Sequence, residues 1–241
     1  MVDACFAEPR LAALYDAFEG SREDLAFYSA IALELGAASV IDLGCGTGTF
    51  ACVLAEQGHA VTGIDPAEAS VALAQAKPFA DRVRWIVGEI ADYQGPVVDL
   101  LTMTGNVAQV FVSDTAWSAA LRWCRMAVRM GGWIVFETRD PRRQAWRHWI
   151  PEETTKRVFV PGVGRVEARC ELTQVEFPFV SFRWTYTFAQ DGTTMRSDST
   201  LRFRERDELC AALAEADFEV TDVRDAPDRP GAEMVFIAQA T

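Results

Sequence analysis

The sequence predicts an α/β fold in which a doubly wound, mostly parallel β-sheet carries helices on both faces and a smaller antiparallel sheet is inserted near its end. Three observations support this fold class. Five short apolar segments alternate with helix-like segments between residues 39 and 140, which is typical of a parallel sheet. A glycine-rich turn follows the first of these segments. Polar and apolar residues alternate through much of residues 141–203, as they do in antiparallel strands.

The segment Ser39–Phe50 carries the most informative motif, SVIDLGCGTGTF. It predicts a short apolar strand, then a turn with a glycine at every second position, then a helix that continues to Gln57. Gly44, Gly46 and Gly48 let backbone groups approach a ligand, beside the positive end of the helix. We therefore expect the turn to bind a small molecule, and the alternative is a tight corner with a purely structural role.

The spacing of the glycines distinguishes between ligands. A dinucleotide-binding turn reads G-x-G-x-x-G and has its third glycine where this chain has Thr49. Here the pattern is D-x-G-x-G-x-G, and the carboxylate of Asp42 would repel a pyrophosphate but suits an amino group. Asp42 and the glycines resemble the first motif of the class I methyltransferases that use S-adenosylmethionine. The resemblance implies that the cofactor contacts Asp42, Gly44, Cys45, Gly46, Thr47 and Gly48.

Composition favours a small-molecule ligand. The 241 residues carry a formal net charge of −12 and a pI near 4.7, whereas nucleic acids and anionic membranes are bound by basic surfaces. We therefore expect neither as a partner. The six cysteines include no C-x-x-C pair, and we assign no metal ion. Reduced thiols, the lack of a signal peptide and the lack of a membrane-spanning apolar run predict a cytoplasmic protein.

Two amphipathic helices are predicted before the glycine turn, over Pro9–Phe18 and Arg22–Leu35. In the methyltransferases that this chain resembles, such helices often cover the cofactor, and we assign this role to residues 1–38. A tyrosine in a Y-D dipeptide implies by the same resemblance that Tyr15 contacts cofactor or substrate, while aromatic packing is the alternative. Arg22 is either a partner of the cofactor carboxylate or a solvated side chain.

The second strand ends in Asp65, where a carboxylate can hold the two hydroxyls of a ribose. Asp65 can at the same time cap the helix predicted over Pro66–Ala76, and Pro66 completes this part of the predicted cofactor site. The resembled family often has a methionine that packs on the adenine in the next turn. Ser70 stands at that position here and departs from the pattern.

The third strand, over residues 82–88, is followed directly by an acidic residue. The resemblance implies that Glu89 accepts a hydrogen bond from the adenine amino group and that Ile90 meets the ring, although aspartate is commoner at the first position. Asp92 is a candidate helix cap.

The fourth strand is predicted over Val97–Met103. The resemblance implies that Met103, Thr104 and Asn106 lie in the loop under the methionine part of the cofactor. Asn106 is equally suited to cap the following turn. A helix over Asp114–Met130, ended by two glycines, then leads to a fifth strand over residues 133–140. Because ligands bind at the carboxyl ends of parallel strands, these motifs converge on one edge of the sheet.

The C-terminal part reads as a helix over Glu205–Ala216 and strands over Phe218–Arg224 and Glu233–Gln239. The resembled family closes its Rossmann-like sheet with such a helix and two strands. This resemblance implies a seven-stranded sheet whose last strand runs antiparallel. We assign residues 39–140 and 204–241 to this cofactor-binding domain.

Residues 141–203 form an insertion in that domain, for which we predict three or four antiparallel strands. The pair Asp191-Gly192 is a hairpin signal, because glycine tolerates the positive φ angle that the turn requires. Such a sheet would cover the mouth of the active site, bind the substrate or form a dimer contact. We favour a cover, with a homodimer contact as the alternative.

The chemistry of a sulfonium methyl group makes few demands on the protein, which mainly aligns the acceptor and excludes water. Where a base is needed, Glu137 and His148 are the candidates. Trp146 and Trp184 either stack on a planar acceptor or pack in the core.

Arg139 suits an acidic substrate or pairs with one of the acids Glu137, Asp140 and Glu152. We predict a methyltransferase that uses S-adenosylmethionine and methylates N, O or C of a small molecule. Methylation of RNA or protein is an alternative, disfavoured by the charge and by the lack of an N-P-P-Y type motif after the fourth strand. A cofactor-binding module without transfer activity is another alternative.

Overall fold

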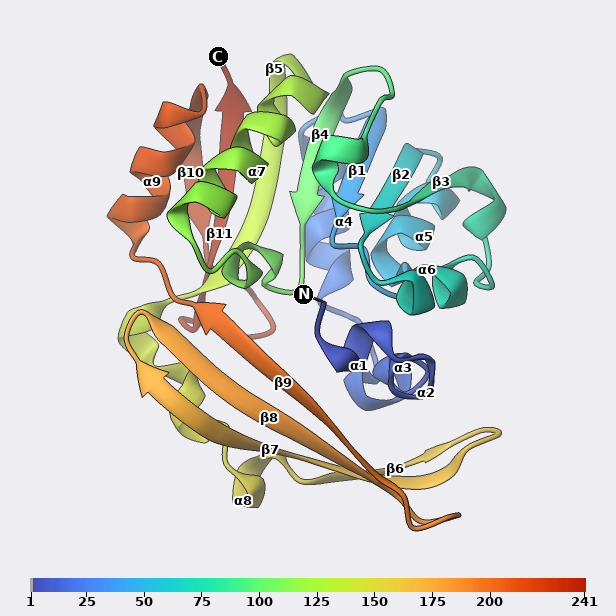
Figure 1. Ribbon diagram of the computed structural model, residues 1–241. Helices are drawn as coiled ribbons and strands as arrows, with labels where there is room; N and C mark the ends of the chain where they lie inside the picture. Colours follow the sequence, from blue (N-terminus) through green and yellow to red (C-terminus); the bar gives the residue numbers. More distant parts are fainter. Residues whose placement is uncertain (1) are drawn as a thin grey trace.

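The computed structural model describes residues 2–241 and contains two β-sheets (Figure 1). The larger has seven strands in the order β10-β11-β5-β4-β1-β2-β3. These are β1 (Ser39–Leu43), β2 (Ala60–Asp65), β3 (Val83–Val87), β4 (Val98–Met103), β5 (Val128–Arg139), β10 (Phe218–Arg224) and β11 (Glu233–Ala240). Neighbours pair in parallel except at β11, which is antiparallel to both β5 and β10. The predicted α/β fold, with its antiparallel last strand, is confirmed.

Helices cover both faces of this sheet. They are α4 (Leu25–Glu34), α5 (Thr49–Glu56), α6 (Glu68–Ala74), α7 (Asp114–Ala127) and α9 (Arg206–Glu215). Val40 of β1 belongs to the core formed with α4 and α5, and the next residue, Ile41, belongs to the core formed with α7 and α9. Successive side chains of a strand point to opposite faces. The apolar run of β1 is therefore buried on both sides, as expected for a central parallel strand.

The inserted residues form a separate four-stranded antiparallel sheet in the order β6-β7-β8-β9. Its strands are β6 (Lys156–Val160), β7 (Gly164–Glu176), β8 (Phe179–Phe188) and β9 (Thr194–Arg202). Figure 1 shows this sheet facing the carboxyl ends of β1 and β4. The predicted hairpin turn lies between β8 and β9, and Gly192 has a φ of +70° there. The prediction of an antiparallel insertion is confirmed.

Three short helices lie between the two sheets in Figure 1: α1 (Ala4–Ala7), α2 (Pro9–Ala12) and α3 (Tyr15–Glu19). The single helix predicted over Pro9–Phe18 is therefore wrong, and the second helix begins at Leu25 instead of Arg22. Leu11 and Leu14 are buried in a cluster with Val166 and Phe188 of the inserted sheet. Packing on that sheet decides the local conformation here, because helices this short have little stability of their own.

The helix predicted over Asp114–Met130 ends earlier, at Ala127, and β5 begins at Val128. The pairing of β4 with β5 has an irregular register at this point. A Cβ at Gly132 would lie 2.9 Å from the backbone oxygen of Asp99, so glycine is needed for the close approach of the two strands. The glycine pair therefore shapes the start of a strand and does not end the helix.

The remaining connections contain short helical turns. They are η1 (Ala80–Arg82), η2 (Ile90–Asp92), η3 (Val107–Val110), η4 (Pro141–Arg143), η5 (Ala145–His148) and α8 (Pro151–Thr154). The helices predicted over Pro66–Ala76 and Glu205–Ala216 are each slightly shorter than expected, as α6 and α9. Within residues 2–241, none of the helices is long and apolar enough to cross a membrane.

Candidate active site

The three glycines after β1 have different surroundings. All have positive φ angles, which favour glycine. A Cβ at Gly44 would lie 2.4 Å from Val107 Cγ2, and one at Gly48 would lie 2.5 Å from the ring of Trp85. A Cβ at Gly46 would meet no other atom of the described chain within 4 Å. Packing therefore requires glycine at two of the positions, and the middle one leaves the backbone open to a ligand.

Asp42 lies near the end of β1 with 1% of its surface exposed. Its Oδ1 accepts a hydrogen bond from Thr102 Oγ1 at 3.2 Å, while Oδ2 has no hydrogen-bond partner within residues 2–241. Burial raises the pKa of this carboxyl to about 7, and the hydrogen bond from Thr102 opposes the shift. A buried acceptor without a partner is costly. A positively charged donor on a ligand would satisfy the oxygen and favour the ionised carboxylate.

Asp65 ends β2 beside the glycine turn. Its Oδ2 accepts a hydrogen bond from Gly46 N at 2.8 Å, and its Oδ1 accepts one from Ala67 N at 2.8 Å. Burial raises the pKa of Asp65, and these two amides oppose the shift. Each carboxylate oxygen can accept a second hydrogen bond, so the predicted ribose contact remains available. Cys45 is half-buried and Pro66 is exposed at the same corner.

The residues predicted to contact adenine follow β3. Gly88 N donates to Asp65 O at 3.0 Å, which brings the end of β3 beside the end of β2. Glu89 is exposed and Ile90 is buried. The backbone N–H of Glu89 donates to Asp92 Oδ2 at 2.8 Å, so the interpretation of Asp92 as a cap is confirmed. The arrangement leaves the Glu89 side chain at the surface beside the site.

The loop after β4 carries the other predicted cofactor residues. Met103 is completely buried in the core, so a contact with the cofactor would come from its backbone, and Thr104 is half-buried. Asn106 has a φ of +64°, and its Nδ2 donates to Glu233 Oε1 at 3.0 Å. In the described structure its side chain makes no capping hydrogen bond to η3, and Oδ1 has no partner. The alternative that Asn106 is a side-chain cap is therefore wrong.

The N-terminal helices contact the glycine turn directly. Asp16 in α3 accepts a hydrogen bond from Thr47 Oγ1 at 2.6 Å. Ser70, where the resembled family often has a methionine, donates to Phe6 O at 2.9 Å. The ring of Tyr15 packs 5.6 Å from that of Phe6. This packing agrees with the alternative interpretation of Tyr15 as an aromatic packing residue, and its contact with cofactor or substrate stays a prediction.

Glu137 in β5 is 1% exposed and connects three segments of the chain. Its Oε1 accepts hydrogen bonds from the backbone N–H groups of Gly105 and Asn106, and its Oε2 accepts one from Tyr28 OH. Arg229 Nη2 lies 3.7 Å from Oε2. With both oxygens engaged by donors, the carboxylate is suited to holding the loop after β4 in place. These contacts favour a positioning role over the predicted role as a base.

The other candidate base and one of the tryptophans lie in η5 of the insertion. His148 has a side chain that is 72% exposed, and its Nδ1 lies 2.7 Å from Glu153 Oε2. Trp146 is 6% exposed and packs on Phe203, with ring centroids 4.6 Å apart. Trp184 lies on the inserted sheet and stacks with Tyr186 at 6.2 Å. As a base, His148 stays a prediction, and its setting is that of a surface residue.

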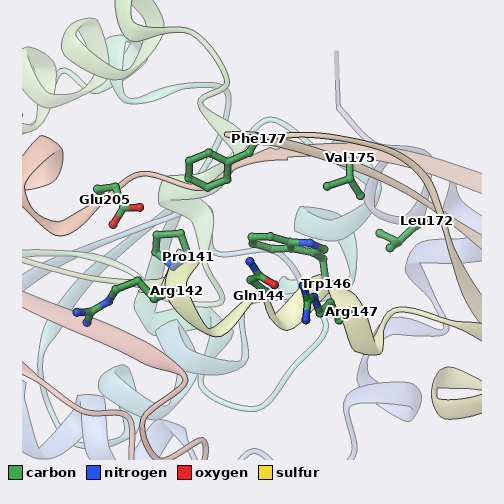
Figure 2. Close-up of a pocket in the computed structure, with 9 residues that line it drawn as sticks. All are labelled: Pro141, Arg142, Gln144, Trp146, Arg147, Leu172, Val175, Phe177 and Glu205. Atoms are coloured by element: carbon green, nitrogen blue, oxygen red, sulfur yellow. The ribbon is translucent and has the colours of Figure 1, made fainter.

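Trp146 also lines an open pocket of about 700 Å³ on the insertion (Figure 2). The pocket is lined by Pro141, Arg142, Gln144, Trp146, Arg147, Leu172, Val175, Phe177 and Glu205. These residues come from η4, η5, the β7–β8 hairpin and the start of α9. The predicted cofactor-binding residues lie outside this lining, so the pocket and the glycine turn are separate places.

Arg139 ends β5 and does not form the predicted pairs with Glu137, Asp140 or Glu152. In the described structure its ion pair is with Glu233, at 4.0 Å. Asp140 instead pairs with the exposed Arg142 at 2.7 Å. Those predicted pairings are wrong, because the backbone at the strand end directs the Asp140 side chain towards its own turn, where it also accepts from Arg142 N.

Sequence reasoning missed several residues that build this region. They are Tyr28, Gln109, Arg229 and Glu233. One signal was available, since an acid inside an apolar strand such as GAEMVFIA needs buried partners. The identity of those partners was not readable, because Tyr28 and Glu137 are 109 residues apart in the chain.

Comparison with known proteins agrees with this geometry. Residues 40–132 match the family described as "Methyltransferase domain". This part of the chain is a class I methyltransferase domain. The ubiquinone biosynthesis O-methyltransferase of Bordetella avium is 33% identical over 110 residues, 43% of this chain and 44% of that one. The enzyme of the same name from Pseudomonas entomophila is 32% identical over 120 residues, 46% and 49% of the two chains. The chain thus matches about half or less of the length of these curated relatives.

Solved structures resemble this chain along nearly its whole length. The CcbJ methyltransferase of Streptomyces caelestis has a TM-score of 0.81, 20% identity and full coverage of both chains. CalS10, an amino pentose methyltransferase from Micromonospora echinaspora solved with S-adenosylmethionine bound, has a TM-score of 0.72, 22% identity and 95% coverage of both. At these identities the likeness establishes a shared fold.

Proposed function

We propose that the protein is an S-adenosylmethionine-dependent methyltransferase that transfers a methyl group to N, O or C of a small molecule. The observation that carries the proposal is the buried Oδ2 of Asp42, which has no partner among the described residues, together with the open backbone of Gly46 four residues further along the chain. A ligand that combines an ammonium group with an adenosine fits this pair of features. The methyltransferase family match and the S-adenosylmethionine bound to CalS10 support the same reading.

Each of the predicted cofactor residues would bind a different part of the cofactor. Asp42 would hold the ammonium group, the backbone of residues 44–48 would pass beneath the ligand, and Asp65 would accept the ribose hydroxyls. Glu89 and Ile90 would contact the adenine. The remaining contacts are proposed from Tyr15, Pro66, Met103, Thr104 and Asn106.

When bound, the cofactor supplies a methyl group on a positively charged sulfur, which a nucleophile in line with the carbon–sulfur bond can attack. The protein then has to position the acceptor and exclude water. The contact between Asp16 and Thr47 holds α3 over the turn, and Glu137 holds the loop after β4. We propose that positioning is the main contribution of this chain, since the carboxylate of Glu137 is fully engaged and His148 is exposed.

The inserted sheet is proposed to cover the acceptor, with Trp184 among the residues on the face that carries the packed aromatic rings. A homodimer contact through the insertion is the alternative. A cytoplasmic location is also part of the proposal. Its support is that the six cysteines are free thiols in the described structure, as is usual in a reducing compartment.

Calorimetric titration with S-adenosylhomocysteine tests the cofactor assignment. We expect binding by the wild type and an affinity about 10- to 100-fold weaker in Asp42→Asn, because a hydrogen bond to a charged group is lost. Asp198→Asn, an exposed aspartate that pairs with Arg183, is the matched control and should bind like the wild type. Failure of the wild type to bind would overturn the proposal.

Methyl transfer needs a second experiment, because binding alone would also fit a module without activity. The protein is incubated with S-adenosylmethionine and a panel of amines, phenols and acidic carbon compounds, and both methylated products and S-adenosylhomocysteine are measured by mass spectrometry. Tight cofactor binding with no product over a broad panel would favour the module.

A further inference from the structure

Arg139 is a largely enclosed cation whose charge is poorly balanced by the protein. It ends β5, and its side chain is 23% exposed. Its Nη1 donates to Gln109 Oε1 at 2.8 Å, and its guanidinium carbon lies 5.3 Å from the centre of the Trp149 ring. Within residues 2–241 its ion pair is the one with Glu233, where the atoms are 4.0 Å apart, too far for a hydrogen bond.

Glu233 is already engaged by other donors. Its Oε1 accepts from Arg229 Nη1 at 2.6 Å and from Asn106 Nδ2 at 3.0 Å. Burial raises the pKa of Glu233 to about 7, and the neighbouring carboxylate of Glu137 adds to the shift. The Glu233 oxygen nearest to Arg139 is therefore already occupied by Arg229 and Asn106. Arg139 has no hydrogen bond to a carboxylate in the described structure.

Gln109 supplies a second donor at the same place. Its side chain is 1% exposed, and the oxygen of its amide is occupied by Arg139. The nitrogen of the same amide, Nε2, is buried and has no hydrogen-bond partner in the described part of the chain. Because both atoms belong to one planar amide, the free N–H group lies beside the guanidinium. Glu233 Oε2 and Asn106 Oδ1 are buried acceptors in the same region, but neither accepts a hydrogen bond from Arg139 or Gln109 in the described structure. The guanidinium and the amide N–H group together offer donors that suit an anionic oxygen group.

We propose that the methyl acceptor carries an anionic oxygen group, in the simplest case a carboxylate, which binds between Arg139 and Gln109. This inference rests on the proposed function and names the substrate class of the same site. A planar guanidinium can donate two parallel hydrogen bonds to a carboxylate. The ring of Trp149 beneath the guanidinium restricts its orientation and favours the positive charge.

The carboxylate of the cofactor itself is a competing occupant, and the sheet places it elsewhere. Asp42 aligns with Thr102 of β4, and Thr102 aligns with Val135 of β5. Arg139 is therefore two strands across and four residues further along, roughly 10 Å in one direction and roughly 13 Å in the other. The ammonium and carboxylate of an amino acid share one carbon atom. These backbone offsets favour separate positions for the cofactor carboxylate and the anion at Arg139, and the first arm of the test distinguishes the two.

Arg22 is the other candidate for the cofactor carboxylate. In the described structure its Nη2 lies 2.9 Å from Asp24 Oδ2, and its positive charge partly opposes the rise that burial causes in the pKa of Asp42. The two arginines would then hold two different carboxylates, one on the cofactor and one on the acceptor.

The first arm of the test separates these two sources of the anion. S-adenosylhomocysteine and 5′-methylthioadenosine, which lacks the amino acid part, are titrated into the wild type and Arg139→Gln. We expect both ligands to bind the variant within about twofold of the wild type. A loss of more than about tenfold for S-adenosylhomocysteine alone would assign Arg139 to the cofactor and overturn the proposal.

The second arm measures the anion site directly. Acetate, benzoate and cinnamate are titrated into the protein saturated with S-adenosylhomocysteine, and benzamide serves as the neutral match of benzoate. Binding is measured by calorimetry and by tryptophan fluorescence. We expect at least one carboxylate to bind with a dissociation constant of about 1–10 mM and benzamide to bind at least about tenfold more weakly than benzoate. Arg139→Gln and Gln109→Ala should each weaken carboxylate binding by about tenfold or more.

The controls keep this result interpretable. Arg183→Gln removes an exposed arginine paired with Asp198 and should leave carboxylate binding unchanged. Thermal unfolding establishes whether each variant is folded. If Arg139→Gln does not fold, the comparison is made with Gln109→Ala. Equal binding of benzoate and benzamide, unchanged binding in the folded variants, or no binding of any of the three carboxylates would overturn the proposal. If the wild type does not bind S-adenosylhomocysteine at all, the proposed function fails first and separately.

Discussion

Two carboxylates in the larger sheet, Asp42 in β1 and Glu137 in β5, are equally buried, at 1% exposure each, but their surroundings differ. Asp42 has one oxygen engaged by Thr102 and one oxygen without a partner in the described structure. Glu137 has both oxygens engaged, by Tyr28 and by two backbone N–H groups. The difference separates a carboxylate with an oxygen left for the proposed ligand from one that holds a loop, although the sequence assigned both to the active site.

The comparison extends to the regions around the two acids. The region of Asp42 is mostly local, because its motif, its turn and the end of β2 lie within residues 39–67, while its partner Thr102 comes from β4. The region of Glu137 is assembled from four distant segments, since Asn106 and Glu233 are 127 residues apart. A closed network of this kind stabilises the fold, whereas an open one is available for binding. Mutations should therefore have different effects in the two regions.

The largest effect is expected on the closed side, from Glu137→Ala. Removal of this carboxylate leaves Tyr28 OH and the N–H groups of Gly105 and Asn106 without their acceptor, and Arg229 loses one of its ion pairs. A broken buried network of this kind costs about 3–5 kcal/mol of unfolding free energy. Urea unfolding followed by circular dichroism measures it. Glu152→Ala, at an exposed position, is the matched control and should change the value by less than about 0.5 kcal/mol. A cost below about 1 kcal/mol for Glu137→Ala would contradict the closed network.

The second expected effect compares two glycines within the open region. Gly48→Ala would bring a Cβ to 2.5 Å from Trp85 at a φ of +76°, and we expect a loss of about 2–4 kcal/mol of unfolding free energy. Gly46→Ala has the strained φ but free space around it, so its loss should be about 1–2 kcal/mol.

The binding measurement should rank the two glycine variants in the opposite order. A methyl group at residue 46 projects into the space proposed for the ligand. In the folded protein, Gly46→Ala should therefore lower the affinity for S-adenosylhomocysteine more than Gly48→Ala does. Thermal unfolding and calorimetry on the same samples give both quantities. If Gly46→Ala binds as well as the wild type, the open backbone is not part of the cofactor site.

Local patterns in the sequence were sufficient for most of the fold. The strand–helix alternation, the glycine spacing and the hairpin signal at Asp191-Gly192 each depend on residues close together in the chain, and the structure confirms the elements that they predict. The errors came where distant contacts override local preference. The helix predicted over Pro9–Phe18 divides because Leu11 and Leu14 pack on the inserted sheet.

The candidate site was predictable to the same extent. The strand ends that carry Asp42, Asp65 and Glu89 follow from the parallel topology, and Gly88 N bonded to Asp65 O brings two of them together. Their binding roles remain predictions. The pairing of Arg139 was predicted wrongly because nearness in sequence suggested Asp140, whereas the fold turns Asp140 towards Arg142. Partners of a buried charge come from whichever segments the fold brings close, and a single sequence does not contain that information.

The smallest expected effect is a pH dependence of cofactor binding through Asp42. Burial raises the pKa of this carboxyl to about 7 in the free protein, above the value of about 3.9 for an unfolded chain. The ionised form is the one that accepts a ligand ammonium, and its population rises from about one tenth at pH 6 to about nine tenths at pH 8. The affinity for S-adenosylhomocysteine should therefore rise about tenfold over this interval. Calorimetry at four pH values in this range measures the slope.

The raised pKa of Asp42 has the opposite effect on stability: affinity for the ligand rises with pH, whereas the unfolding free energy of the free protein falls. This provides an internal check. Because the native carboxyl keeps its proton to a higher pH than the unfolded one, the native state binds more protons between about pH 4 and pH 7, and stability without ligand falls as the pH rises through that window. Asp42→Asn should flatten both the binding slope and this stability loss. Glu233 also has a pKa raised to about 7 by burial, but it lies in the closed region, so Glu233→Gln should reduce the stability slope and leave the binding slope intact. If Glu233→Gln abolished the binding slope while Asp42→Asn preserved it, the assignment of the open and closed regions would be reversed.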